Sequence, residues 1–104
     1  MKLYFSITGA GNTAVELANL RLGVPKGKKW TIEEMKGQSA ANVNTVCTIL
    51  VGGDQRFQYT PRTSSTPVPV NEEFEEGTEI ILTITNLEAL AQIASFTIGV
   101  DEHA

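Results

Sequence analysis

The feature that most constrains the fold is the two-residue alternation over residues 42–51, the clearest in the chain. One phase holds Val43, Thr45, Cys47, Ile49 and Val51, while Asn42, Asn44, Val46, Thr48 and Leu50 occupy the other. Successive side chains of a β-strand point to opposite faces, so this alternation predicts a strand with one buried face. The residues that follow, Gly52-Gly53-Asp54, predict a hairpin turn into a strand over 56–60.

Runs of the same kind recur along the whole chain, separated by Gly, Pro, Asn and Asp. Among the 104 residues are 12 threonines, 8 valines and 8 isoleucines, the β-branched types that favour strands. We expect the remaining strands over 2–7, 13–22, 28–35, 66–70, 79–85 and 95–100, with a bulge near Ala18-Asn19. Residues 87–92 are expected to form one helical turn or a loop.

About eight strands at a spacing of roughly 8–14 residues predict an all-β fold. We expect residues 1–104 to form a single domain, an antiparallel two-sheet β-sandwich, with the jelly roll favoured and an immunoglobulin-like sandwich as the alternative. A chain of 11.2 kDa can bury about two-thirds of its surface without disulfides or metal. No apolar run approaches the roughly 20 residues of a membrane span or the form of a signal peptide, so neither membrane insertion nor classical secretion is expected.

The charge of the chain argues against nucleic acid as a partner. The formal net charge is −4, with 8 basic and 12 acidic side chains. Residues 1–36 carry six basic and three acidic side chains, whereas residues 37–104 carry two basic and nine acidic ones. The cations are too few and too scattered to supply the electrostatic affinity that nucleic-acid binding requires.

Two short features suggest chemistry, but a simpler interpretation is favoured for each. Gly9-Ala10-Gly11-Asn12 lacks the third glycine of a dinucleotide fingerprint and the Lys-Ser/Thr of a P-loop, so we expect a plain turn. Cys47 shares its phase with apolar residues and is expected to be a small buried hydrophobe with an unperturbed or raised pKa. A nucleophilic role would need His103, the single histidine, which we expect in a disordered tail.

Five carboxylates crowd into one segment, at Glu72, Glu73, Glu75, Glu76 and Glu79. Their spacing matches no EF-hand, so we favour a solvated acidic loop over a calcium site. A glycosidase acid–base pair would need a cleft that so short a chain has little length to build. We expect the loop to be mobile unless it is neutralised, and we favour contact with Lys26, Lys28 and Lys29 of a neighbouring subunit over calcium.

The aromatic residues allow two interpretations. Trp30, Phe57, Tyr59 and Tyr4 could form an exposed platform for sugar rings. We favour the alternative in which Trp30 with Ile32, and Phe57 with Tyr59, fill the core, because the chain has only seven aromatic residues. The side on which these rings lie therefore decides between the two interpretations.

The residues support no catalytic, cofactor-binding or metal-ligating site, so we expect a protein without enzymatic activity or cofactor. Four segments carry a family resemblance: Val24-Pro25-Lys26-Gly27-Lys28-Lys29-Trp30-Thr31-Ile32, residues 42–51, residues 76–86, and Phe96-Thr97-Ile98-Gly99-Val100. Together, over about residues 22–101, they resemble the small β-sandwich structural proteins of tailed-bacteriophage virions, of the head-decoration, head-fibre and tail-accessory type. The resemblance implies a non-enzymatic particle component located in the virion, in contact with other virion proteins.

Two further patterns agree with an assembly role. The outer phases are rich in Thr and Asn and low in charge, as subunit interfaces tend to be, at Asn42, Asn44, Thr48, Thr83, Thr85 and Thr97. The uneven charge offers complementary patches, so we expect a homo-oligomer, with a trimer suggested by analogy with other jelly rolls. The alternative to this function is a carbohydrate-binding module with a glycan ligand, and the alternative location is the cytoplasm; a hydrolase accessory domain ranks third.

Overall fold

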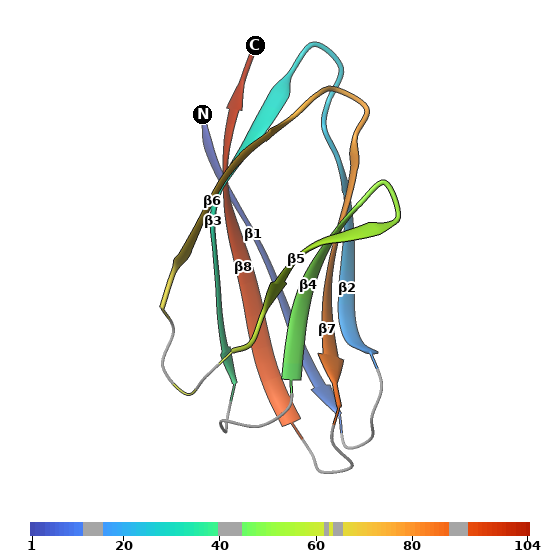
Figure 1. The fold of residues 1–104 in the computed structure, drawn as a ribbon, viewed down its shortest axis with the longest axis vertical. Helices are drawn as coiled ribbons and strands as arrows, with labels where there is room; N and C mark the ends of the chain where they lie inside the picture. Colours follow the sequence, from blue (N-terminus) through green and yellow to red (C-terminus); the bar gives the residue numbers. More distant parts are fainter. Residues whose placement is uncertain (12–15, 40–44, 62, 64–65, 88–91) are drawn as a thin grey trace.

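The computed structural model describes residues 1–11, 16–39, 45–61, 63, 66–87 and 92–104. Eight strands form within these ranges: β1 (Lys2–Gly11), β2 (Glu16–Gly23), β3 (Lys29–Ser39), β4 (Thr45–Val51), β5 (Asp54–Tyr59), β6 (Val68–Phe74), β7 (Glu79–Asn86) and β8 (Gln92–His103). They build two four-stranded sheets that pack face to face (Figure 1). The described ranges contain no helix that could cross a membrane.

The strand order identifies the sandwich as a jelly roll. The two sheets have the orders β1-β8-β3-β6 and β2-β7-β4-β5, with every neighbouring pair antiparallel. The first strand thus pairs with the last, the second with the seventh, the third with the sixth, and the fourth with the fifth. Such a chain is one long hairpin wrapped over two sheets, which confirms the expected fold class and its favoured member. An immunoglobulin-like sandwich would instead pair more strands that follow each other in sequence.

The hairpin at the centre of this arrangement forms where the sequence predicts it. Val51 pairs with Asp54, so Gly52 and Gly53 alone make the loop between β4 and β5. Their φ angles of 60° and 92° lie in the left-handed region that a two-residue hairpin loop needs and that glycine adopts without strain.

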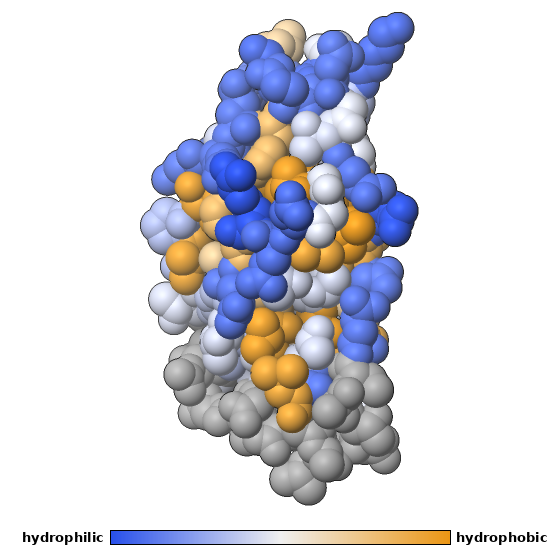
Figure 2. Space-filling model, turned by 45° about the vertical axis from the view of Figure 1, so that its right-hand side comes forward, coloured by the Kyte–Doolittle hydropathy of each residue, from blue (hydrophilic) through white to orange (hydrophobic). Residues whose placement is uncertain are grey.

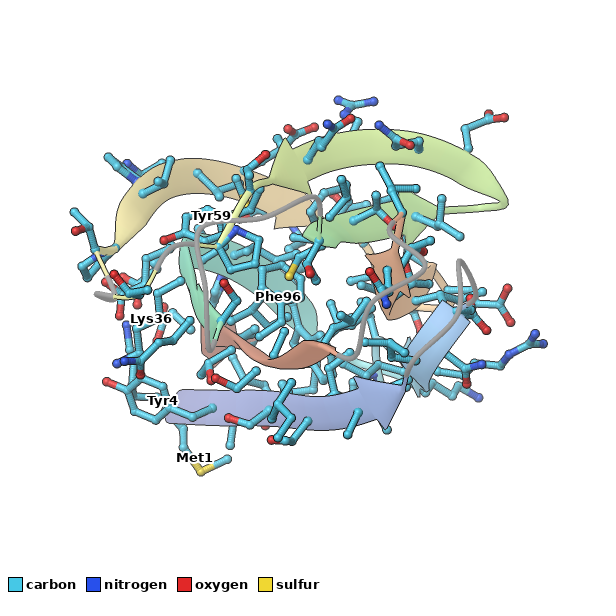
Figure 3. All side chains as sticks on the ribbon, turned by 90° about the horizontal axis from the view of Figure 1, so that it is seen from below. Met1, Tyr4, Lys36, Tyr59 and Phe96 are labelled. Atoms are coloured by element: carbon cyan, nitrogen blue, oxygen red, sulfur yellow. The ribbon has the colours of Figure 1, made fainter. Side chains whose placement is uncertain are left out.

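The core lies between the two sheets and takes alternate residues from the inner strands. Phe96, Ile98 and Val100 of β8 are fully buried, as are the isoleucines and leucine that β3, β4 and β7 contribute, Ile32, Ile49, Ile80, Leu82 and Ile84. Figure 3 shows Phe96 between the sheets with Tyr59 above it, and the two rings stack at a centroid distance of 6.2 Å. The alternation that predicted the strands therefore also selected the buried face.

Three of the four aromatic residues of the proposed platform face inward, so the core interpretation is confirmed for them. Trp30 is 4% exposed, stacks on Phe5 at 5.2 Å, and donates a hydrogen bond from Nε1 to Glu102 Oε1 at 3.1 Å. Tyr59 is buried, and the half-buried Phe57 packs against the core. Tyr4 is 60% exposed and is the exception.

Two glycine segments expected to end strands lie inside strands instead. Gly9 and Gly11 belong to β1, so the predicted turn is wrong there, and its last residue, Asn12, lies outside the described residues. A Cβ on Gly9 would meet Leu17 of the opposite sheet at 2.7 Å. Gly37, which follows the strand expected over 28–35, lies inside β3, where a Cβ would come within 2.8 Å of the Ser95 carbonyl oxygen and 3.2 Å of the Tyr59 ring. The local sequence favours turns at Gly9, Gly11 and Gly37, whereas in the structure these glycines allow close packing between the sheets.

The segment from 66 to 79 also differs from the expectation. The predicted edge strand over 66–70 is β6, but it runs on to Phe74 and takes Glu72 and Glu73 into the sheet, opposite Ile32 and Thr31 of β3. The acidic segment is therefore half strand and half turn. Pairing with β3 compensates for the poor strand propensity of consecutive glutamates.

The C-terminal end is ordered, contrary to the prediction. β8 continues to His103, which pairs with Lys29 of β3, and its Nε2 lies 3.2 Å from both Thr31 Oγ1 and Glu73 Oε2. The expected bulge in the second strand is present, with the register shift between Glu16 and Ala18. The helical turn or loop expected over 87–92 falls largely on 88–91, outside the described residues.

Replacing Trp30 by alanine should destabilise the protein strongly. The change removes a buried ring, its stacking on Phe5 and its hydrogen bond to Glu102, and should lower the free energy of unfolding by roughly 3–5 kcal/mol. Urea unfolding followed by fluorescence and circular dichroism measures this loss. Tyr4→Ala is the matched control, because an exposed ring should cost no more than about 0.5 kcal/mol; equal losses in the two variants would contradict the core assignment.

Candidate functional site

The outer face of the β1-β8-β3-β6 sheet carries a continuous strip of polar side chains. The strand register aligns it in three rows across β1, β8 and β3. We define the polar strip by these rows: Thr8, Ser95 and Gln38; Ser6, Thr97 and Lys36; Tyr4, Gly99 and Glu34. Apart from Gly99, its members are exposed or half-buried. Three adjacent strands thus present hydroxyl, amide and charged groups on one surface.

Tyr4 is the aromatic member of the polar strip. All seven aromatic residues lie in the described ranges, and Tyr4 alone has an exposed ring. Figure 3 shows Tyr4 and Lys36 on the outer side of the sheet, away from Phe96. Its partner across the ladder is Gly99, beside which the Lys2 and Glu34 side chains lie, and Lys2 Nζ lies over the ring at 5.4 Å from its centroid. The ring still keeps 60% of its residue surface exposed, so part of it is open to a ligand.

The first two rows of the polar strip offer hydrogen-bonding groups. Ser6 Oγ and Thr97 Oγ1 lie 2.7 Å apart, and Gln38 donates from Nε2 to the carbonyl oxygen of Thr63 at 2.7 Å. Each hydroxyl keeps further acceptor capacity, as does the Gln38 amide oxygen. A shallow cavity of about 310 Å³ opens at this end, lined by Thr8, Gln38, Ser39, Ile93, Ala94 and Ser95.

The opposite end of the polar strip is charged. A second cavity of about 420 Å³ is lined by Lys2, Glu33, Glu34, Pro67, Pro69 and Asn71. Lys2 donates a hydrogen bond to Glu33, and this bond raises the pKa of the Lys2 ammonium. The Tyr4 ring thus lies between a hydroxyl-rich region and an ion pair.

The outer face of the second sheet has a different character. Val46, Leu50 and Ile81 are half-buried there without belonging to the core, and they alternate with polar residues of the same strands. Figure 2 shows this side of the molecule, with hydrophobic atoms between hydrophilic ones. None of the seven aromatic residues is exposed on it, so it offers no ring on which a ligand could stack.

The five carboxylates of the acidic segment are each partnered within the chain. Glu72 pairs with Arg56, Glu73 with His103, Glu75 with Lys29 at 4.0 Å, and Glu79 with Arg21, while Glu76 accepts a hydrogen bond from the amide of Gly27 at 3.1 Å. These partners belong to the same chain, whereas the contact with Lys26, Lys28 and Lys29 of a neighbouring subunit that the sequence favoured stays a prediction. The described residues include no group of three or more side chains that could hold a metal ion.

Cys47 behaves as the sequence predicts. It is fully buried in β4, and burial raises the pKa of its thiol from 9.0 to about 12. His103 lies at the end of β8 in the other sheet and is engaged with Thr31 and Glu73. The two residues therefore form no nucleophile–base pair.

Sequence reasoning named Tyr4 and Thr97 but missed the rest of the polar strip. The signal was present in the first run, where Lys2, Tyr4, Ser6 and Thr8 share one phase and the apolar residues share the other. The alternation within the first strand could not reveal which other strands lie beside it in the sheet. Only the register of β1 against β8, and of β8 against β3, brings the rows together.

Comparison with known proteins gives structural neighbours. No known sequence family and no curated protein sequence matches the chain. Among solved structures, a CBM4 carbohydrate-binding module has a TM-score of 0.51 at 12% identity, over 94% of this chain and 84% of that protein. A family two carbohydrate esterase from Clostridium thermocellum, in complex with cellohexaose, has a TM-score of 0.51 at 14% identity, over 86% of this chain and 25% of that one.

A third neighbour is the insecticidal delta-endotoxin Cry8Ea1 from Bacillus thuringiensis, with a TM-score of 0.50 at 9% identity over 91% of this chain. This chain spans 25% of the esterase and 19% of the toxin, so it is similar to one part of each. At these identities the likeness establishes a small all-β sandwich fold. Nothing in the comparisons supports the bacteriophage origin that the sequence resemblance implied.

The buried thiol should make stability depend on pH in the alkaline range. Unfolded Cys47 ionises near pH 9, whereas the folded thiol stays protonated to about pH 12. Its contribution is fully present below pH 9 and is lost as the pH rises through this window, by up to about 1.4 kcal/mol per pH unit. Chemical unfolding of the parent and of Cys47→Ala between pH 8 and 11 isolates it. Parallel pH profiles for the two proteins would contradict the assignment.

Calcium should not stabilise the protein. Because each carboxylate of the acidic segment already has a partner in the chain, an added cation would have to displace an existing contact. We expect the melting temperature to be the same in millimolar calcium and in chelator. A rise with calcium that chelator reverses would show that the segment is a metal site after all.

Proposed function

We propose that this protein is a non-catalytic carbohydrate-binding domain that holds its ligand on the polar strip. The observation that carries the proposal is the Tyr4 ring, which is 60% exposed on the outer face of the β1-β8-β3-β6 sheet, in the row next to the hydroxyl groups of Ser6 and Thr97. This is the sugar-platform interpretation of the sequence, reduced from four aromatic residues to one.

The chemistry of the polar strip suits a sugar. A pyranose ring has a C–H face that stacks on an aromatic ring, and its hydroxyl groups form hydrogen bonds with hydroxyl, amide and charged side chains. Tyr4 supplies the ring, while Ser6, Thr97 and Gln38 supply the hydrogen-bonding groups two to four residues along the strands. Successive rows lie about 7 Å apart, so an extended oligosaccharide could contact all three.

The structural neighbours agree with this function. Two of the three proteins described above are a carbohydrate-binding module and an esterase whose structure holds cellohexaose, and both share the sandwich fold. A binding module performs no chemistry, and the sequence predicts no catalytic residue. The virion role remains an alternative prediction for which the structure offers no specific observation.

Tyr4→Ala should weaken glycan binding while leaving the fold intact. A glycan array with the parent protein identifies the ligand, and titration calorimetry with the matching soluble oligosaccharide measures its affinity. We expect Tyr4→Ala to raise Kd at least tenfold, about 1.4 kcal/mol, because the stacking surface is lost. Tyr4→Phe keeps the ring and should stay within about threefold of the parent, a difference of roughly 0.6 kcal/mol.

The control variant lies on the other sheet. Gln58→Ala removes an exposed amide of β5 and should leave glycan affinity unchanged. The proposal fails if no glycan binds, or if Tyr4→Ala binds as well as the parent. It also fails if Gln58→Ala reduces the affinity as much as Tyr4→Ala does, since the ligand would then contact the other face.

A further inference from the structure

The outer edge of β1 is unpaired, and the register shows which of its backbone groups point away from the sheet. β1 is the terminal strand of its sheet. At its start, Met1 donates from its N-terminus to the carbonyl of Glu102 at 2.7 Å and accepts from the amide of Glu102 at 2.8 Å, so these two residues form a hydrogen-bonded pair. Hydrogen-bonded and non-hydrogen-bonded pairs alternate along an antiparallel ladder. The register with β8 has no shift, so odd-numbered residues of β1 face β8 and even-numbered ones face outward.

The backbone N–H and C=O groups of Lys2, Tyr4 and Ser6 therefore point away from the sheet, in its plane. No hydrogen bond joins these groups to another described residue. A row of such groups is a template for an added strand. β1 also carries a single charged side chain, Lys2, so its edge lacks the charges that usually discourage pairing.

The other three edge strands are interrupted, whereas β1 is regular. β2 has a bulge at its start, between Glu16 and Ala18, and β5 has an extra residue opposite the Ile49–Leu50 step. β6 contains Pro69 and the left-handed Asn71, whose φ is 52°. Bulges, proline and twisted backbone all prevent edge-to-edge pairing. β1 alone pairs without interruption over all ten of its residues.

The inward side chains of the first half of β1 show where a further strand would fit. Leu3 and Phe5 point into the sandwich but remain half-buried, while Val100 and Ile98, their partners on β8, are fully buried. In the second half, Ile7 and Gly9 are buried, and Gly9 lies against Leu17 of β2. The open part of the edge is thus Lys2 to Ser6, and its apolar side chains lack a neighbour on one side.

We propose that two copies of this chain pair antiparallel through β1, about a twofold axis at Tyr4, to form a dimer with a continuous eight-stranded sheet. In this register Tyr4 pairs with Tyr4 of the second copy, Lys2 with Ser6, and Leu3 with Phe5. The Leu3 and Phe5 side chains cover each other on the inner face. No like charges meet, because Lys2 faces a serine.

The self-complementary sequence favours a second copy as the occupant. Residues of the same kind lie symmetrically about Tyr4: the apolar Leu3 and Phe5, and the polar Lys2 and Ser6. The segment is therefore complementary to a second copy of itself that runs antiparallel. Among the described strands, β1 is the edge strand that is regular over its whole length, and pairing closes its edge. The dimer does not depend on the proposed glycan binding, although it would bring two polar strips side by side.

A charged side chain introduced at position 6, opposite Lys2 of the second copy, tests both the dimer and its register. We expect the parent to sediment as a dimer at high micromolar concentration and to dissociate on dilution. Ser6→Lys places like charges across the axis and should raise the dimer dissociation constant at least tenfold. Ser6→Glu, the matched variant, places opposite charges there and should leave the constant equal or lower. The difference should shrink in high salt.

A second pair of variants tests the backbone. The Ser6 amide points to the free edge, so Ser6→Pro removes an intersubunit donor without breaking a bond to β8. Ser6→Ala loses the same contact with Thr97 but keeps the amide. We expect Ser6→Pro to be monomeric and Ser6→Ala dimeric, with circular dichroism confirming that both fold. If Ser6→Pro does not fold, the lysine and glutamate pair decides alone.

Three results would overturn the proposal: a monomeric parent over the whole concentration range, a trimeric parent, or a dimer that tolerates Ser6→Lys as well as Ser6→Glu. A trimer would be decisive, because antiparallel pairing about a twofold axis closes at two copies. None of these masses bears on glycan affinity, so the two proposals can fail separately.

Discussion

The pairing of the two ends of the chain is the constraint on which the rest of the structure depends. β8 lies between β1 and β3, so the last strand is held by the first and the third. It supplies Phe96, Ile98 and Val100 to the core and, on its other face, the middle column of the polar strip. Contacts so distant in sequence carry a large loop-closure cost, which the apolar face of β8 must offset by burial.

The strands and the core face follow from the sequence because both depend on alternation. In β4 and β7 each apolar phase is buried as expected, and the two-glycine hairpin fixes where β4 turns into β5. The jelly-roll strand order was favoured but not derivable, because alternation says which face is buried and nothing about which strand lies beside it. The same limit hid the polar strip, whose columns belong to three strands far apart in the chain.

The errors share a physical cause. Gly9, Gly11 and Gly37 look like turns locally, yet each is needed where a side chain of the opposite sheet comes close. Glu72, Glu73 and His103 look like loop or tail residues, yet strand pairing holds them; an ion pair links Glu72 to Arg56, and Glu73 Oε2 lies 3.2 Å from His103 Nε2. In each case a contact from a distant part of the chain outweighs the local preference.

The sequence left assembly and ligand binding as alternative functions, the first supported by low-charge outer phases and the second by aromatic residues that could lie outside. The geometry of a β-sheet removes the conflict. Backbone groups that join strands lie in the plane of the sheet, whereas side chains stand perpendicular to it. The edge of β1 and the ring of Tyr4 therefore point in different directions from the same residues, and a strand added at the edge would place the two Tyr4 rings side by side on the outer face. One strand can thus serve a partner through its backbone and a ligand through its side chains.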